Sequence, residues 1–358
     1  MLAPLRDHLR PNDPASSALL RTTKECYFTR LSGDILPGKP GFEQARWITT
    51  EDVNVEHLLD TFTTIDPNSK STWDTCDKFM AQLSRHKSRP ITLGTKIEAL
   101  PNNHPSKAAC LSSLSQLFDS VGNFVERKRL LSHSLELWRD QGDNAGVAQT
   151  LRDLSDTNRG MGLYNEGIQQ ITEASEIFEQ LGDVVDQADS LTMLALLQCD
   201  ANQLDAAEEA GLCAIDLLPE EGQEFWVGLG HRALGNIYQH KGETKKAIHH
   251  FEVALGIASS LNQVDQLFWG NLSLADVFSE QGRFEDAQTH PERAKSHAVH
   301  NTYLLGYAMY QQARVWYRQH RIEEARSEAL RALDVFERLG AASDAEFTRA
   351  ILREIDAR

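Results

Sequence analysis

The chain has 358 residues, 41% of them hydrophobic, which is enough to build a sizeable core. Its formal net charge is −16 at pH 7, and residues 1–105 hold 13 basic and 13 acidic side chains, so the whole excess belongs to the later residues. No run approaches the 18 or so apolar residues of a membrane span, and the first ten residues are unlike a secretory signal. An acidic surface repels nucleic-acid phosphates and anionic lipid. We expect a cytoplasmic chain that binds neither nucleic acid nor membrane. Its acidic surface either favours basic partners or only keeps a long helical surface soluble.

Residues 1–105 are predicted to form a small helical region followed by a linker. A helix is expected over residues 14–31, then a Pro/Gly loop, then a second helix whose capping signature spans residues 49–52. A third helix is predicted over residues 71–86, with Trp73, Phe79 and Leu83 facing inward. The stretch at residues 89–105 is expected to be a short extended segment and a Pro/Asn linker.

From residue 106 onward the sequence repeats itself. Alanines recur at intervals of 40, 40, 40 and 38 residues, and other small or large apolar residues keep the same offsets from them. A period of 20 to 50 residues with such offsets indicates stacked helical hairpins. We predict six hairpins over residues 106–340, a capping helix over residues 341–358, and an all-α solenoid with a right-handed superhelical path. The repeated alanines are Ala174, Ala214, Ala254, Ala294 and Ala332.

The fourth unit shows why small residues recur. Gly235 and Ala247 allow two helices to cross closely, while Tyr238 and Phe251 fill the space beside the contact. Gly242 suits a helix end with positive φ. The first helices of the six units are predicted at residues 107–120, 146–160, 186–200, 225–240, 265–280 and 303–318.

These offsets resemble the tetratricopeptide repeat. The family pattern is matched in the fourth unit by His231, Leu234, Gly235, Tyr238, Ala247, Phe251 and Ala254. With residues 1–14 and 46–62, the repeats are also similar to the C-terminal part of fungal STAND NTPases, the NB-ARC or NACHT proteins with such repeats. That resemblance implies a repeat array acting as the sensor of a nucleotide-driven switch, and no complete switch domain fits in this chain.

Two residues, Arg127 and Pro291, depart from the repeat pattern, and each predicts a local change in structure. Arg127 stands where the later units have a small residue, so the first unit is degenerate. Pro291 stands at the position of Phe251, seven residues into a helix predicted to begin near Phe284. Because proline removes a backbone donor and clashes with the preceding turn, a kink or break is predicted there.

Motifs for catalysis or cofactor binding are incomplete. Residues 33–40 match a phosphate-binding loop except at Pro40, which has neither hydroxyl nor amide, and we interpret them as a surface turn. The fragment at residues 228–233 is similar to a dinucleotide-binding loop. It lies in a repeat helix, however, and does not follow a strand as such a loop would. Five cysteines are scattered without a CxxC pair. His240, His249 and His250, like His290, His297 and His300, are interpreted as exposed helix residues. We therefore predict no enzyme activity, no cofactor and no metal.

The function predicted from these observations is recognition of a protein or peptide segment in the concave groove of the solenoid. In the related repeats the first helices line that groove, and large aromatic side chains and arginines there anchor interfaces. The same offsets also select Thr192, Leu196, Cys199 and Leu272. An alternative is that the aromatic side chains pack between repeats, and another is that the array restrains a nucleotide-binding domain absent from this chain. The predicted groove residues are Arg152, Asp156, Arg159, Arg232, Asn236, Gln239, Trp269, Asp276, Tyr307, Tyr310, Arg314 and Tyr317.

Overall fold

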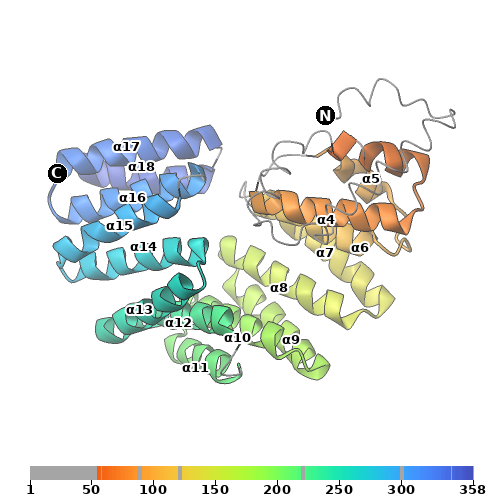
Figure 1. The fold of residues 1–358 in the computed structure, drawn as a ribbon, viewed down its shortest axis with the longest axis horizontal. Helices are drawn as coiled ribbons and strands as arrows, with labels where there is room; N and C mark the ends of the chain where they lie inside the picture. Colours follow the sequence, from red (N-terminus) through yellow and green to blue (C-terminus); the bar gives the residue numbers. More distant parts are fainter. Residues whose placement is uncertain are drawn as a thin grey trace. The chain divides into compact units, whose positions relative to one another are not determined.

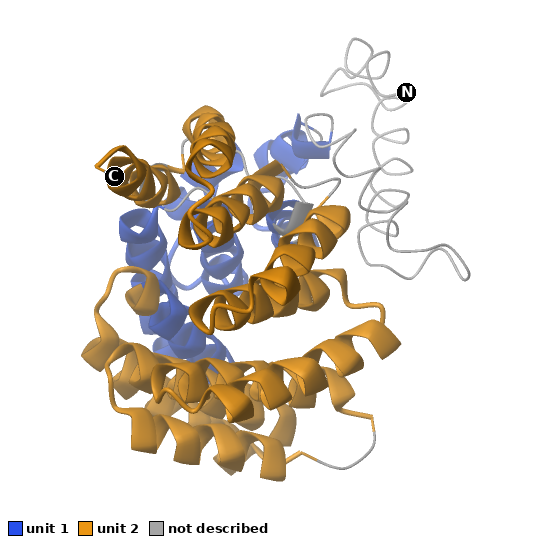
Figure 2. Cartoon of the chain, turned by 90° about the vertical axis from the view of Figure 1, so that its left-hand side faces the viewer, with its two compact units in different colours: residues 1–157 blue, residues 158–358 orange. Residues whose placement is uncertain are grey.

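The computed structural model describes residues 55–57, 59–86, 91–119, 123–218, 222–298, 302–339 and 341–357. The helix expected over residues 14–31, the capping signature at residues 49–52 and the loop-like motif at residues 33–40 lie outside the described residues. Packing divides the chain into two compact units, residues 1–157 and 158–358 (Figure 2). Within the described part, no helix is long and apolar enough to cross a membrane.

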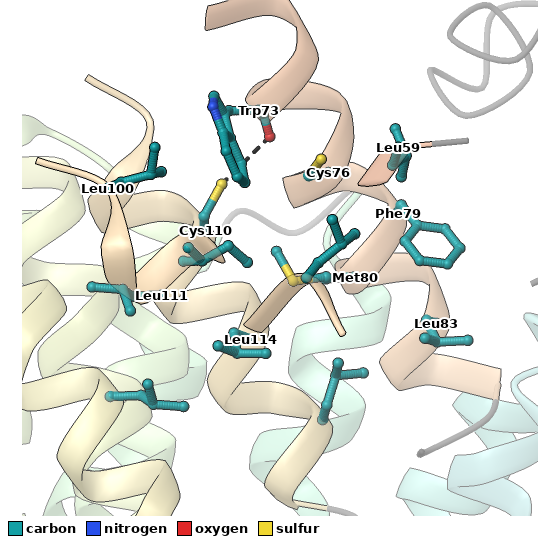
Figure 3. Packing of buried hydrophobic residues seen from close by; sticks show 14 of the residues in the cluster. Leu59, Trp73, Cys76, Phe79, Met80, Leu83, Leu100, Cys110, Leu111 and Leu114 are labelled. Carbon is teal, nitrogen blue, oxygen red and sulfur yellow. Dashed lines mark hydrogen bonds between the residues drawn. The ribbon is translucent and has the colours of Figure 1, made fainter. Parts of the chain in front are cut away.

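The first unit has a core built by helices from both sides of the predicted boundary at residue 105. Helix α4 (Lys70–His86) contributes Trp73, Phe79 and Leu83, all at most 1% exposed, as the sequence predicted. Figure 3 shows these side chains together with Leu111 and Leu114 of α6 (Lys107–Asp119). The described residues before and after position 105 thus share one core, whereas the predicted boundary follows the repeat pattern alone.

The prediction of an extended segment after residue 89 is wrong. Residues Leu93–Ala99 form a short helix, α5, and Leu93 and Ile97 are fully buried. Their spacing of four places both side chains on one helix face, which packs into the same core. The prolines and asparagines that suggested a linker begin only at Pro101, after α5 has ended.

The repeat region consists of helices of similar length joined by short turns (Figure 1). The first helices lie within two residues of their predicted bounds, and the final helix, α18 (Ala342–Asp356), occupies the place of the predicted cap. The remaining helices are α7 (Phe124–Gln141), α8 (Asn144–Gly160), α9 (Tyr164–Leu181), α10 (Val184–Asp200), α11 (Leu204–Asp216), α12 (Glu224–His240), α13 (Thr244–Ser260), α14 (Val264–Glu280), α15 (Phe284–His297), α16 (Thr302–Arg318) and α17 (Ile322–Leu339).

The turns adopt the left-handed backbone that the pattern predicted. Gly242 has φ 74° and Asn202 has φ 59° at equivalent places between the helices of two hairpins. Between hairpins, Gly182 ends α9 with φ 70°, and the side chain of Asp183 accepts a hydrogen bond from the backbone of Asp186 at the start of α10. Glycine and asparagine tolerate this conformation best, so the turn positions fix where each helix ends.

Close helix crossing explains the small residues of the fourth hairpin. A Cβ atom added at Gly235 of α12 would lie 2.5 Å from Cε1 of Phe251 on α13. Phe251 and Ala247 are fully buried, and Tyr238 is 5% exposed. The missing side chain of Gly235 is therefore the space that the Phe251 ring occupies.

The expectation of a break at Pro291 is wrong, because α15 continues as an α-helix from Phe284 to His297 with the proline inside it. Pro291 is buried beside Ala287 and Ala294, so the tertiary packing of that face holds the helix together despite the lost hydrogen bond. A bend in the helix axis at Pro291 stays a prediction. At the other irregular position, Arg127 is buried and its Nη1 pairs with Asp119 at 2.7 Å.

Candidate partner-binding face

The twelve predicted groove residues all lie on first helices of the hairpins, namely α8, α12, α14 and α16. We call this set the first-helix face. The four other positions selected by the same offsets are all buried, with Thr192, Leu196 and Leu272 at most 8% exposed. Cys199 is 3% exposed, and burial raises the pKa of its thiol to about 11.

Many charges on this face are already used between neighbouring hairpins. Nε of Arg159 lies 2.5 Å from Asp200 of α10, and Gln239 donates to Glu280 of α14 at 3.0 Å. Within the first unit, Asp156 accepts from the buried Arg127 at 2.9 Å. These three predicted residues therefore join structural elements and are not free for a ligand.

Asp276 of α14 is the centre of the largest of these networks. One carboxylate oxygen accepts from Arg314 at 2.9 Å and the other accepts from Arg318 at 3.1 Å, both from α16. Gln311 approaches the same carboxylate at 3.4 Å. The sequence reasoning missed Arg318 and Gln311, although Arg318 lies one helical turn after Arg314, which was the available signal.

Next to this network lies an aromatic cluster, which we define as Trp269, Tyr307 and Tyr310. The rings of Trp269 and Tyr307 meet edge to face with centroids 5.0 Å apart, and Tyr310 lies 6.0 Å beyond Tyr307. The Arg314 guanidinium lies 5.8 Å from the Tyr310 ring. All three aromatic side chains remain half-buried, so they pack between hairpins and still present part of their surface.

Burial of these rings changes their chemistry. It raises the pKa of the Tyr307 hydroxyl to about 12, so this group stays protonated and remains a hydrogen-bond donor at neutral pH. Aromatic side chains with a polar tip are favoured where a surface binds a partner, because one end is apolar and the other forms hydrogen bonds. The cluster therefore has the composition of an interface anchor.

Arg232 of α12 is in a different situation from the other arginines of the face in the second unit. Its Nε donates to the Gln266 side chain at 3.2 Å, and within the described residues no carboxylate pairs with it. Burial lowers the pKa of its guanidinium, and the charge of Arg159 lowers it further. An arginine remains charged in spite of such a shift, so this is an enclosed cation without an anionic partner.

Arg232 also borders a small pocket between three helices. Gly228 belongs to its wall, where a Cβ atom would approach Ile257 to 3.1 Å, so the space is already narrow. The second helix α13 supplies part of the lining, which the sequence reasoning missed because it considered first helices alone. The lining residues are Phe225, Gly228, Arg232, Ala254, Ile257, Ala258, Leu261, Gln263 and Gln266.

The remaining predicted residues are more peripheral. Asn236 and Arg152 are half-buried on α12 and α8, and the Tyr317 hydroxyl donates to the Glu354 backbone at the long distance of 3.4 Å. Among the described histidines, His240 and His249 are exposed as expected, whereas His290 is only 8% exposed and His250 is half-buried. No group of three or more potential metal ligands occurs within the described residues.

Comparisons with known proteins agree with this architecture. No protein-family model matches the chain. The human tetratricopeptide repeat protein 29 is 23% identical over 158 residues, which are 42% of this chain and 33% of that protein, so the match spans only a third of the relative. A Rap protein solved in complex with Competence and Sporulation Factor has a TM-score of 0.57 at 14% identity and covers 93% of this chain and 98% of its own.

A second solved structure extends the comparison to signalling ATPases. A STAND protein with a tetratricopeptide repeat sensor, from Pyrococcus horikoshii, has a TM-score of 0.52 at 15% identity. The likeness covers 93% of this chain and 49% of that protein. The chain is therefore an α-solenoid with the fold of tetratricopeptide-repeat proteins.

Proposed function

We propose that the second unit binds an extended segment of a partner protein, with an acidic side chain or terminal carboxylate at Arg232 and apolar side chains on the aromatic cluster. The observation that carries this proposal is the enclosed Arg232 guanidinium. Arg159 and Arg314 have carboxylate partners at 2.5 and 2.9 Å, whereas Arg232 has only the neutral Gln266 among the described residues. A half-buried cation without an anion is partly desolvated and unpaired, and an incoming carboxylate would supply the missing partner.

The aromatic cluster supports the second half of the proposal. Trp269, Tyr307 and Tyr310 form one contiguous, half-buried aromatic cluster on α14 and α16, and α14 contacts α12. The Rap neighbour was solved in complex with a factor, which shows that one chain of this fold binds another molecule. Because that neighbour is only 14% identical, its ligand is not transferred to the present chain, and the proposed ligand is inferred from the present chain's own residues.

The test is selection of peptides from a displayed random library, followed by affinity measurements with Arg232→Gln. We expect peptides in which an acidic residue lies near aromatic or aliphatic residues. Loss of a hydrogen-bonded ion pair costs about 1.5–3 kcal/mol, so Arg232→Gln should weaken binding by roughly 10- to 100-fold. Arg293→Gln, an exposed arginine on the second helix α15, is the matched control and should change nothing.

The aromatic cluster needs its own comparison. Tyr310→Ala should weaken binding of the same peptides, whereas Phe347→Ala, at a 60% exposed aromatic residue of α18, should not. Equal affinities for Arg232→Gln and Arg293→Gln would remove the basis of the proposal. Equal affinities for the two aromatic variants would restrict the binding site to the pocket.

A second candidate function is that of a sensor in a STAND-type switch. The supporting observation is that the likeness to the Pyrococcus horikoshii protein covers 93% of this chain but only 49% of that protein. A complete Walker motif encoded upstream of Met1 in the same reading frame would support this function. An upstream stop codon in the same frame would contradict it.

A further inference from the structure

The fourth hairpin holds two histidine side chains in direct contact. Nδ1 of His231 on α12 lies 2.9 Å from Nδ1 of His250 on α13, and the ring centroids are 5.1 Å apart. The His250 ring also stacks on Tyr238, with centroids 5.2 Å apart and planes inclined by 25°. The two histidines therefore form a hydrogen bond that joins the two helices of the hairpin.

Neighbouring hairpins fill the same register differently. Forty residues further along the chain, His290 bonds to Asn271 at 2.9 Å and stacks on Phe278 in the same way. Forty residues earlier, the corresponding positions hold Leu191 and Ala210. The chain thus places a histidine–asparagine pair and an apolar pair at the same two register positions of neighbouring hairpins.

The number of protons that each contact tolerates follows from the chemistry of the groups. Two Nδ1 atoms share one hydrogen, so one ring donates and the other accepts. The donating ring can take up a proton at Nε2 without losing the bond. A further proton must bind the accepting Nδ1, which abolishes the bond and sets two cations against each other. In the His290 contact the Asn271 oxygen accepts, so protonation of His290 leaves that bond in place, although burial lowers the pKa of His290 to about 4 as well.

The charged groups around the pair do not compensate for a second proton. Glu208 of α11 is the nearest acid, but it already accepts from the Tyr238 hydroxyl at 2.7 Å and pairs with Lys241, which also binds Asp205. On α13, Lys246 lies over the Tyr238 ring and His249 contacts His250. Glu243, which precedes α13, pairs with Lys246 at 2.6 Å.

Most of these surroundings act in the same direction on both rings, while Glu208 alone raises the pKa of His250. Burial, followed by the charges of His231, His249 and Lys246, lowers the pKa of His250 to about 4. Burial and His249 also lower the pKa of His231. Because the unfolded chain binds protons near pH 6.5, stability from the pair is complete above that pH and is lost progressively as the pH falls toward 4.

We propose that the His231–His250 pair is an acid-sensitive latch between α12 and α13. At neutral pH it closes the fourth hairpin, and uptake of the second proton opens it, while the neighbouring Asn271–His290 contact keeps its hydrogen bond. The two helices that the latch joins also line the pocket beside Arg232. The proposal goes beyond the proposed function, since the latch is a property of the hairpin with or without a partner.

The latch is tested by hydrogen exchange of the full chain between pH 7.5 and 5.0, corrected for the intrinsic exchange rate. Each proton taken up on opening raises the opening constant tenfold per pH unit below about 6.5, so α12 and α13 should open roughly 30-fold more at pH 5.0 for one proton and more still when both rings take one up. His231→Asn, which copies the natural Asn271 contact, should take up about one proton less on opening. Its acid response should therefore be roughly tenfold or more weaker over this range.

Two internal references make the result decisive. The helices α14 and α15 should respond to pH identically in both proteins, because the substitution leaves Asn271 and His290 in place. His231→Leu/His250→Ala, which copies Leu191 and Ala210, should abolish the extra opening of α12 and α13 at low pH that the histidine pair causes. This double variant also replaces His231→Asn in the experiment if His231→Asn is poorly folded. Parallel pH dependence of α12 and α13 in the wild-type protein and the double variant would overturn the proposal. So would imidazole nitrogen shifts showing both Nδ1 atoms protonated while the hairpin remains protected.

Discussion

The close crossing of α12 and α13 permits a quantitative test of how the repeat is built, with Gly235→Ala as the perturbation. The added Cβ atom would lie 2.5, 2.6 and 2.9 Å from three carbons of the Phe251 ring, which is fully buried. Overpacking of this kind costs about 1–3 kcal/mol. In the same helix interior, replacing glycine by alanine gains about 1 kcal/mol of helix propensity.

Gly256 of the partner helix α13 is the matched control. It also lies within a 17-residue helix, and no atom lies within 4 Å of the place its Cβ would occupy. Gly256→Ala should therefore stabilise the hairpin by up to about 1 kcal/mol. Since the propensity gain is common to both variants, their difference in the free energy of unfolding equals the overpacking cost, about 1–3 kcal/mol.

Hydrogen exchange of α12 and α13 measures this difference, since long repeat arrays do not always unfold in a single cooperative step. Gly235→Ala should open more readily than Gly256→Ala. A double-mutant cycle with Phe251→Leu should show a favourable coupling of about 1 kcal/mol or more, because the smaller side chain relieves the clash. The reasoning is refuted if Gly235→Ala stabilises the hairpin as much as Gly256→Ala.

Three further predictions concern α14 and α16. Gln312 is 1% exposed at the repeat position where earlier hairpins have a buried leucine, and its Oε1 has no hydrogen-bond partner. Gln312→Leu should therefore stabilise the protein by about 1–3 kcal/mol in urea unfolding, and a loss of stability would contradict this. Asp276→Asn should cost about 1–3 kcal/mol, because it removes the charge that two arginines of α16 share, and an unchanged urea midpoint would show that their pairing is not stabilising. Tyr303→Phe loses the 3.1 Å hydrogen bond to Asp344 and should cost about 1 kcal/mol of stability in thermal unfolding. Tyr307→Phe should change stability by less than about 0.5 kcal/mol, and equal effects of the two substitutions would show that the Tyr303 hydrogen bond is not stabilising.

The positions of the repeat helices followed from the sequence because their determinants are local or strictly periodic. Small residues such as Gly235 and Ala247 mark the crossings, and turn residues such as Gly242 and Asn202 mark the helix ends, so the period reports both. Where the period is absent the prediction was less good. The helix α5 was mistaken for an extended segment, because seven residues are too few for a clear helical pattern.

Two irregular residues show the limits of local rules. Pro291 disfavours a helix by its own chemistry, yet α15 continues through it because its buried face is held by the neighbouring hairpins. Arg127 replaces a small residue and is nevertheless buried, because Asp119 and Asp156 supply its counter-charges. In both cases contacts with neighbouring helices decided the outcome.

The sequence by itself determined the architecture, since an alanine register of 40 residues has few physical solutions other than stacked hairpins. It also placed the twelve candidate residues on the first helices of the hairpins, because their offsets within the repeat are fixed. Only the tertiary structure distinguished among them: Arg159 and Arg314 are neutralised by Asp200 and Asp276, whereas Arg232 has no such partner within the described residues. The reason is that pairing of charges depends on distances between neighbouring hairpins, which no single repeat encodes.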